Sequence, residues 1–357
     1  MTVSEDFASL TTRFRGELLA HCYRMLGSAE EAEDLVQETY LRAWRSYDRF
    51  EGRSSVRTWL YRIATNVCLT AIERRGRRPL PSGLGAPSDD PEAPVVAGPE
   101  VPWLQPFPDV LLAAEREDPA AVTVSRASIR LAFVAALQHL TARQRAVLIL
   151  RDVLEWPAAE VANLLGTTKT AVNSALRRAR AQLAQALPAE DELAEPAEPD
   201  RQALLERFAA AVENADATAL ARLLREDVEL EMPPLLTWFA GRSAVARYFA
   251  SQPFVGPGRL RLVQVAANGQ PAFASYLREP DGTYQAHAVT LPAMTSTGIA
   301  RIVTFRDPGL FGLFGLPQAC SPAELSRRAA AEADDRAAGK VVRQAGAIPA
   351  HPGGLYP

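Results

Sequence analysis

The chain has 357 residues, enough for two or three domains that each bury their own core. Its 39 basic and 42 acidic residues give a formal charge of -3, so the overall balance does not by itself indicate a nucleic-acid partner. No segment approaches the roughly 18 apolar residues of a membrane helix, so we expect no membrane contact.

The charge is unevenly distributed along the chain. Residues 39–78 carry ten arginines against three acidic residues, and residues 141–187 carry six arginines and one lysine against three. Residues 188–200 hold six acidic residues and no base. The sequence therefore predicts two basic modules, with an acidic connector after the second.

Cysteine usage indicates the compartment. Cys22, Cys68 and Cys320 lack the paired spacing of a zinc site or of a disulfide framework. We therefore expect three packing residues, a reducing cytoplasmic location, no metal site and no cofactor.

Proline content and apolar periodicity divide the chain. The segment after residue 78 is rich in proline and glycine, and helical periodicity resumes near residue 128. Within this linker, the apolar stretch from Trp103 to Leu112 is expected to dock on a partner or on a neighbouring domain. The expected units are a helical domain (1–78), a Pro-rich linker (79–125), a second helical domain (126–187), an acidic linker (188–200), a third domain (201–322) and a flexible tail (323–357).

The first module contains a predicted helix over residues 30–45. Its apolar residues recur at three-to-four spacing and predict a buried stripe, formed by Ala32, Leu35, Val36, Ala43 and Trp44. The opposite face is rich in acidic residues, namely Glu31, Asp34, Gln37, Glu38 and Arg42. This face is either a solvated surface or a docking surface for a basic partner.

The next predicted helix combines cations, aromatics and an amide. Leu60, Ile63, Ala64 and Val67 mark its packed side, which places Trp59, Arg62 and Asn66 near another side, after Arg53 and Arg57. Aromatic faces stack with bases, and arginines neutralise phosphates, so this mixture suits single-stranded or melted DNA. The alternative is that Trp59 and Tyr61 fill a small helical core.

Residues 34–68, DLVQETYLRAWRSYDRFEGRSSVRTWLYRIATNVC, closely resemble region 2 of the sigma-70 family, in its extracytoplasmic-function branch. The resemblance implies that the acidic helix binds the clamp of the polymerase β′ subunit through Asp34, Gln37 and Glu38. It also implies that the following turn and helix capture the melted minus-10 element, through Phe50, Arg53, Trp59, Arg62 and Asn66.

The second module predicts a helix-turn-helix. Thr141 and Gln144 form a capping-box signature, Trp156-Pro157 opens a second helix, and Gly166 ends it before a third helix over residues 169–186. The outward face of the third helix is polar and basic: Lys169, Thr170, Asn173, Ser174, Arg177, Arg178 and Arg180. This pattern is typical of a recognition helix, and the alternative is a basic surface helix in a bundle.

Residues 135–183 also resemble sigma region 4, which reads the minus-35 element. The resemblance assigns Asn173, Ser174 and Arg177 to bases and Arg178 and Arg180 to the DNA backbone, and implies the polymerase β flap as a partner. A repressor or activator needs only a helix-turn-helix, whereas a sigma factor needs both modules in this order. We therefore expect a sigma factor that binds core RNA polymerase and promoter DNA. The alternative is a helix-turn-helix regulator that never joins the polymerase.

The third domain mixes helices and strands. Helices are predicted at residues 204–212, 217–224 and 243–250, and strands at 259–267, 271–278, 283–291 and 300–305. Turn signals lie at Asn268-Gly269, Asp281-Gly282 and Thr297-Gly298. The order of elements resembles the SnoaL-like and nuclear-transport-factor-two-like superfamily, whose curled sheet wraps around a pocket. The fold expected for the chain is therefore two all-α sigma domains followed by an α+β cone.

Members of that superfamily include isomerases and cyclases, so a fused ketosteroid-isomerase-like or polyketide-cyclase-like enzyme is a further alternative. The candidate ligand pocket is Trp238, Tyr248, Tyr276 and His287. His287 is the only histidine in these strands, and residues 259–291 have no acidic residue in mid-strand, so we expect no catalytic residue and no enzyme. The domain is expected to regulate the sigma modules, by inhibiting or assisting them, and to be a candidate for binding a small ligand.

Overall fold

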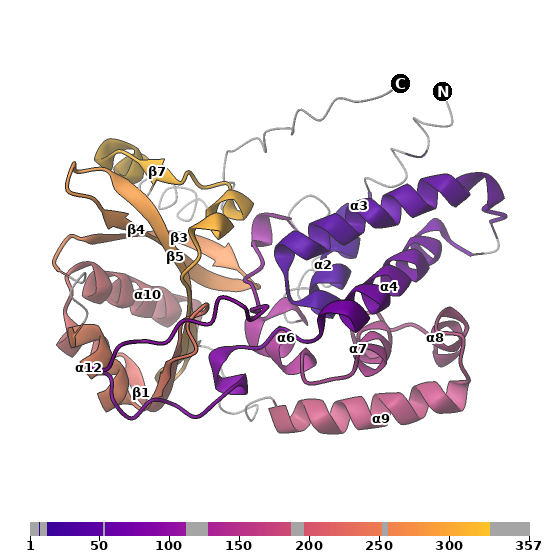
Figure 1. Ribbon diagram of the computed structural model, residues 1–357, viewed down its shortest axis with the longest axis horizontal. Helices are drawn as coiled ribbons and strands as arrows, with labels where there is room; N and C mark the ends of the chain where they lie inside the picture. Colours follow the sequence, from indigo (N-terminus) through magenta and orange to yellow (C-terminus); the bar gives the residue numbers. More distant parts are fainter. Residues whose placement is uncertain are drawn as a thin grey trace.

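The computed structural model describes residues 7, 13–52, 54–111, 128–186, 196–251 and 256–328. The helical modules pack together on one side of the molecule, and the sheet domain lies on the other (Figure 1). The long connection between the two helical modules, coloured purple to magenta, runs out across the sheet domain before it returns (Figure 1). Within these described ranges no helix is both long and apolar enough to cross a membrane.

The first helical domain is built from α2 (Arg15–Leu26), α3 (Ala29–Ser46) and α4 (Val56–Arg75). Ser28 and Ser55 cap α3 and α4 by accepting the backbone N–H of Glu31 and Thr58. The stripe predicted for α3 is wrong at one position, because Trp44 is 45% exposed and touches Phe7 only edge-on.

Two of the three cysteines meet inside this domain. Cys22 on α2 and Cys68 on α4 are buried free thiols that hydrogen-bond to each other. This hydrogen bond, followed by burial, raises the pKa of Cys68. The two residues therefore pack the α2–α4 contact as thiols.

The second helical domain contains α6 (Leu131–Leu137), α7 (Ala142–Leu148), α8 (Ala158–Leu164) and α9 (Lys169–Ala186). The capping box at Thr141 and Gln144 is confirmed, and a π-helical turn (Ile149–Val153) extends α7. Gly166 has φ 60°, in the left-handed region that favours glycine, and makes the tight turn between α8 and α9. The predicted helix-turn-helix is therefore confirmed.

The third domain has helices α10 (Glu198–Glu213), α11 (Ala217–Ala221) and α12 (Arg242–Ser251). Its strands are β1 (Leu224–Glu231), β2 (Trp238–Ala240), β3 (Leu260–Ala267), β4 (Gln270–Arg278), β5 (Tyr284–Thr295), β6 (Gly298–Phe305) and β7 (Ala319–Cys320). They form one sheet in the order β2-β1-β6-β5-β4-β3, with β7 beside β5 and β1 parallel to β6. The four predicted strands and the three turns are confirmed, whereas the second helix ends early because β1 begins at Leu224.

The described part of the linker is attached to this sheet domain. Gly98 N–H donates to Pro234 O at 2.8 Å, and Leu236 N–H donates to Val96 O at 2.7 Å. Farther along, Pro108 bridges to Ala267 at the end of β3. The predicted docking of the apolar linker stretch is thus on a neighbouring domain for residues 103–111, while Leu112 lies outside the described residues.

Candidate nucleic-acid interface and interdomain junction

The acidic face of α3 is only partly available to a partner. Asp34 and Gln37 are exposed, one turn apart, and Glu38 forms a 2.6 Å ion pair with Arg42. Glu31, by contrast, is held by Arg78 at 2.6 Å and also by Arg75. Asp34 and Gln37 therefore form the open part of the face, with Glu38 at its edge.

The predicted minus-10 residues gather around the start of α4. Arg62 and Asn66 are exposed at i and i+4, so they project from one face of the helix. Trp59 is half-buried and packs against Phe50, with the two rings tilted by 32° and their centroids 4.8 Å apart. The structure thus brings four of the five predicted residues together, and Arg53 lies outside the described residues.

The alternative prediction, that the aromatic residues fill a small helical core, holds for Tyr61. Tyr61 is fully buried, and its hydroxyl donates to Glu17 at 3.1 Å. Arg57 pairs with the same carboxylate at 2.6 Å and lies over the Tyr61 ring at 5.0 Å. Tyr61 and Arg57 therefore belong to the domain core and its rim, and Trp59 lies between core and surface.

The recognition helix α9 presents the predicted face. Val172, Leu176 and Ala179 are buried against the module. On the other side six of the seven predicted residues are exposed and Ser174 is half-buried: Lys169, Thr170, Asn173, Ser174, Arg177, Arg178 and Arg180. Arg180 differs from its neighbours because it forms a bidentate pair with Asp152, at 2.8 and 2.7 Å. Its guanidinium must share or exchange that partner to contact a phosphate.

The two helical modules are packed directly against each other. The rings of Tyr61 on α4 and Trp156, just before α8, lie 5.6 Å apart, edge to face. Arg145 on α7 donates to the carbonyl oxygen of Met25 at the end of α2. Arg24 on α2 donates to the hydroxyl oxygen of Ser128 at 2.7 Å.

Both of these arginines are buried, and burial lowers the pKa of each to about 10. Two desolvated cations make the contact costly unless their hydrogen bonds are kept. The hydrogen bonds that Arg24 and Arg145 make across the contact are therefore needed to offset that cost.

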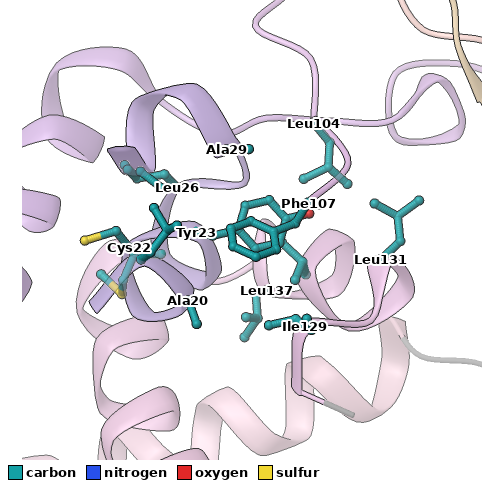
Figure 2. Packing of buried hydrophobic residues seen from close by; sticks show 14 of the residues in the cluster. Ala20, Cys22, Tyr23, Leu26, Ala29, Leu104, Phe107, Ile129, Leu131 and Leu137 are labelled. Atoms are coloured by element: carbon teal, nitrogen blue, oxygen red, sulfur yellow. The ribbon is translucent and has the colours of Figure 1, made fainter. Parts of the chain in front are cut away.

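The linker fills the gap between the modules. Phe107 is fully buried and packs on Tyr23 with ring centroids 4.6 Å apart (Figure 2). Leu104 lies on one side of this pair, and Ile129 and Leu137 from the second module lie on the other (Figure 2). One cluster thus joins both modules to the segment that connects them.

Asn268, at the tip of the β3–β4 hairpin, ties the sheet domain to this cluster. It is fully buried with φ 54°, and its side-chain amide donates to Tyr23 Oη and to Ile129 O, each at 2.7 Å. Its Oδ1 accepts the backbone N–H of Phe107 at 2.9 Å, and its own N–H donates to Phe107 O at 2.8 Å. One side chain therefore contacts the first module, the linker and the second module. We call this set of contacts the Asn268 lock.

The cone of the sheet domain encloses a pocket of about 810 Å³, including its open mouth. Tyr248 and His287 line it as predicted. The prediction is wrong for the other two residues, Trp238 and Tyr276, which do not line the pocket. Trp238, on the edge strand β2, donates to Gly85 O in the linker at 2.9 Å. Tyr276 points to the other face of the sheet, packs edge-on against Phe311 and donates to Pro317 O.

Sequence reasoning missed two charged residues of the pocket, Asp216 and Arg306. The Asp216 carboxylate caps α11 by accepting the N–H of Ala219 at 2.8 Å. Arg306 directly follows β6, where strand alternation continues the inward row of Ile302 and Thr304. This alternation was the available signal for Arg306.

Comparisons with known proteins match each of the three domains. The chain fits the family descriptions Sigma-70 region 2 over residues 10–78, Sigma-70 region 4 over residues 130–183 and SnoaL-like domain over residues 205–307. It is 51% identical over 316 residues to the ECF RNA polymerase sigma factor SigG of Mycobacterium tuberculosis, covering 87% of this chain and 84% of that protein.

Two further matches concern another protein of the same organism. The chain is 29% identical to the M. tuberculosis ECF RNA polymerase sigma factor SigJ, over 79% of this chain and 85% of that one. The crystal structure of M. tuberculosis SigJ superposes with a TM-score of 0.57 at 23% identity, covering 89% of this chain and all of that one. That superposition supports the arrangement of two helical modules and a sheet domain as the fold.

Proposed function

This chain belongs to the extracytoplasmic-function branch of the sigma-70 family and directs transcription initiation, and we propose that its C-terminal domain holds it in a closed, inactive arrangement. Membership of the family implies binding to core RNA polymerase and to promoter DNA. The Asn268 lock carries the proposal about the closed arrangement, because one buried side chain contacts the first module, the linker and the second module together.

We assign the sigma function to surfaces of the first two modules. Asp34 and Gln37 meet the clamp of the β′ subunit, together with Glu38, because they form the open part of the acidic face of α3 and Glu38 lies at its edge. The second module meets the β flap. The Phe50–Trp59 ring pair, with Arg62, Asn66 and Arg53, captures the melted minus-10 element.

The outward face of α9 supplies the contacts to the minus-35 element. Asn173, Ser174 and Arg177 lie toward its N-terminal half, where a recognition helix reaches base edges. Arg178 and Arg180 hold phosphates, with Arg180 exchanging Asp152 for one of them.

Geometry explains why the closed arrangement is inactive. The names of the two promoter elements place them about 25 base pairs apart, or about 85 Å at about 3.4 Å per base pair. The α9 helix has 18 residues and spans only about 27 Å. Because Tyr61 and Trp156 are in contact, the two modules cannot occupy both elements until they separate.

The linker must also be released. To join two modules that lie about 85 Å apart, residues 79–125 have to span about half of their fully extended length, which is about 155 to 170 Å. In the structure, residues 88–98 instead pair with the segment Pro234–Trp238 of the C-terminal domain, and Phe107 is buried beneath the Asn268 lock. The C-terminal domain therefore controls the module spacing by holding the linker.

The test is run-off transcription with core polymerase, comparing the full chain with a chain that ends at Asp200. The shorter chain is expected to give more promoter-specific transcript per bound sigma, because both the lock and the linker contacts are gone. Equal or lower transcript from the shorter chain, with both chains bound to polymerase, contradicts the closed arrangement. If neither chain gives a specific transcript, the assignment of the sigma surfaces fails.

We further propose that the C-terminal domain binds a small molecule in its cone pocket and catalyses no reaction. The carboxylate that lines the pocket, Asp216, is engaged in capping α11. Burial, with a contribution from Arg306, lowers the pKa of His287 to about 4, so its ring is neutral and a weak base at neutral pH. Both observations favour binding over proton abstraction.

A further inference from the structure

The cone pocket has an apolar wall and a polar end. Its wall is formed by side chains of α10, α12 and the outer strands, including Phe208, Phe249 and Leu262. Because most of the lining is apolar, an apolar body that enters the pocket gains free energy by leaving water.

The polar end lies on the central strands β4, β5 and β6. Thr290 and Thr304 are paired across β5 and β6, and their hydroxyls are 3.1 Å apart. Phe305 pairs with Val289, so Arg306 continues β6 beside Ala288, whose carbonyl oxygen accepts the hydroxyl of Ser275. Polar groups thus gather in two adjacent rows of the sheet.

A β-bulge turns His287 toward the same end. Ser275 pairs with Ala288 and Tyr276 with Ala286, so His287 is the extra residue of β5. Such a bulge re-aims a side chain, and His287 lines the pocket whereas Tyr276 faces the other way.

The charge at this end is positive. Burial lowers the pKa of His287 and raises the pKa of Tyr248, and in both residues the charge of Arg306 acts in the lowering direction, so its field reaches two other lining residues. With His287 neutral, Arg306 is the only cation among the described lining residues at neutral pH, and the carboxylate among them, Asp216, lies at the start of α11 and caps that helix. A positive field at the end of an apolar cavity selects an anionic head group over a cationic one.

The pocket is joined to the linker through a short stretch of backbone. Met232 lines the pocket, and the next residue, Pro233, accepts the N–H of Arg306 at 2.7 Å. Pro234 then accepts the N–H of Gly98 in the linker at 2.8 Å. A short backbone path therefore joins Arg306 to the linker contact at Gly98.

We propose that the cone pocket binds a small amphipathic anion, an apolar body with a carboxylate or an equivalent head group held by Arg306 and His287, and that its occupancy changes the hold on the linker. The effect of occupancy on the linker rests on the proposed role of the C-terminal domain. The binding of the anion depends only on the residues that line the pocket.

Binding is tested by calorimetry on the full chain with three probes that share one apolar body: 2-naphthoate, 2-naphthylmethanol and 2-naphthylmethylammonium. The carboxylate is expected to bind at least tenfold more tightly than the alcohol, and the ammonium more weakly than both. Binding of none of the probes, or equal binding of all three, overturns the proposal.

Variants locate the site. Arg306→Met is expected to abolish the preference for the carboxylate, and Arg306→Lys to keep most of it because the charge remains. The matched control is Arg278→Met, which removes an exposed arginine at the end of β4 and leaves the preference unchanged. An equal loss in both methionine variants, or an undiminished preference in Arg306→Met, overturns the assignment of Arg306.

The link to the linker has its own readout. Saturating 2-naphthoate is expected to change the hydrogen-exchange rate of the Gly98 amide at least threefold, with no change in the Arg306→Met variant. Binding without any change at Gly98 overturns the coupling and leaves the sigma surfaces untouched. Run-off transcription without probe distinguishes that outcome from a failure of the sigma function.

Discussion

Replacing Asn268 by glycine is the sharpest perturbation of the closed arrangement. Glycine adopts the φ of 54° at this position without strain, so the change removes side-chain contacts and little else from the folded state. The lost contacts are the bonds to Tyr23 Oη, to Ile129 O and from the N–H of Phe107. All three lie on segments that belong to the sigma modules or their linker.

The free-energy cost of Asn268→Gly follows from the buried polar groups that lose a hydrogen-bond partner. A buried polar group without its partner costs about 1 to 3 kcal/mol. Tyr23 keeps one bond, because its hydroxyl also donates to Gln105 O at 2.8 Å, so the main penalty falls on Ile129 O and Phe107 N–H. A total of about 3 kcal/mol shifts the ratio of closed to open chains roughly 100-fold toward open.

The assay combines hydrogen exchange at the Phe107 amide with run-off transcription by core polymerase. Asn268→Gly is expected to speed exchange and to raise promoter-specific transcript. Asp281→Gly is the matched control, since Asp281 begins the exposed β4–β5 hairpin turn and only caps Thr283. If Asn268→Gly behaves like this control in both measurements, the reasoning about the lock is refuted.

Two further predictions concern the polymerase surface and the linker seat. Asp34→Arg is expected to weaken binding to core polymerase at least tenfold in a titration, because it reverses an exposed acidic charge of this face. Glu73→Arg, on the exposed side of α4, is expected to leave binding unchanged, and equal effects of the two variants refute the docking surface. Gly27→Ala is expected to lower the free energy of unfolding about 1 to 3 kcal/mol more than Gly76→Ala. Both glycines have φ above 70°, but only at Gly27 does an added Cβ come within 2.7 Å of Leu104. Equal losses of stability in chemical denaturation contradict that contact.

The sequence predicted the elements that are encoded locally. Periodicity placed α4 and α9, the capping box marked the start of α7, and Asn268-Gly269 marked a turn. These features depend on residues three or four apart, which a single sequence displays directly. The exposed faces of α3 and α9 followed for the same reason.

Contacts between residues that lie far apart in the sequence could not be predicted. Nothing local indicates that Asn268 meets Tyr23, 245 positions earlier, because a turn residue of this type is usually solvated. Trp238 and Tyr276 were assigned to the pocket because aromatics suit a ligand site. Trp238 lies on the edge strand β2 and contacts the linker instead, and Tyr276 follows Ser275 on β4, so strand alternation places it on the face opposite the pocket. Bulges and domain contacts have no periodic signature, so they had to be observed.

The central claim is that the C-terminal domain keeps the two sigma modules together, and the distance between them tests it most directly. Labels at Thr70 on α4 and Ala184 on α9, both exposed, report that distance by energy transfer. In the full chain we predict one compact population, and in a chain ending at Asp200, or in Asn268→Gly, a second population that extends toward the separation of about 85 Å required on the promoter. A distance distribution that is the same in all three proteins contradicts the account.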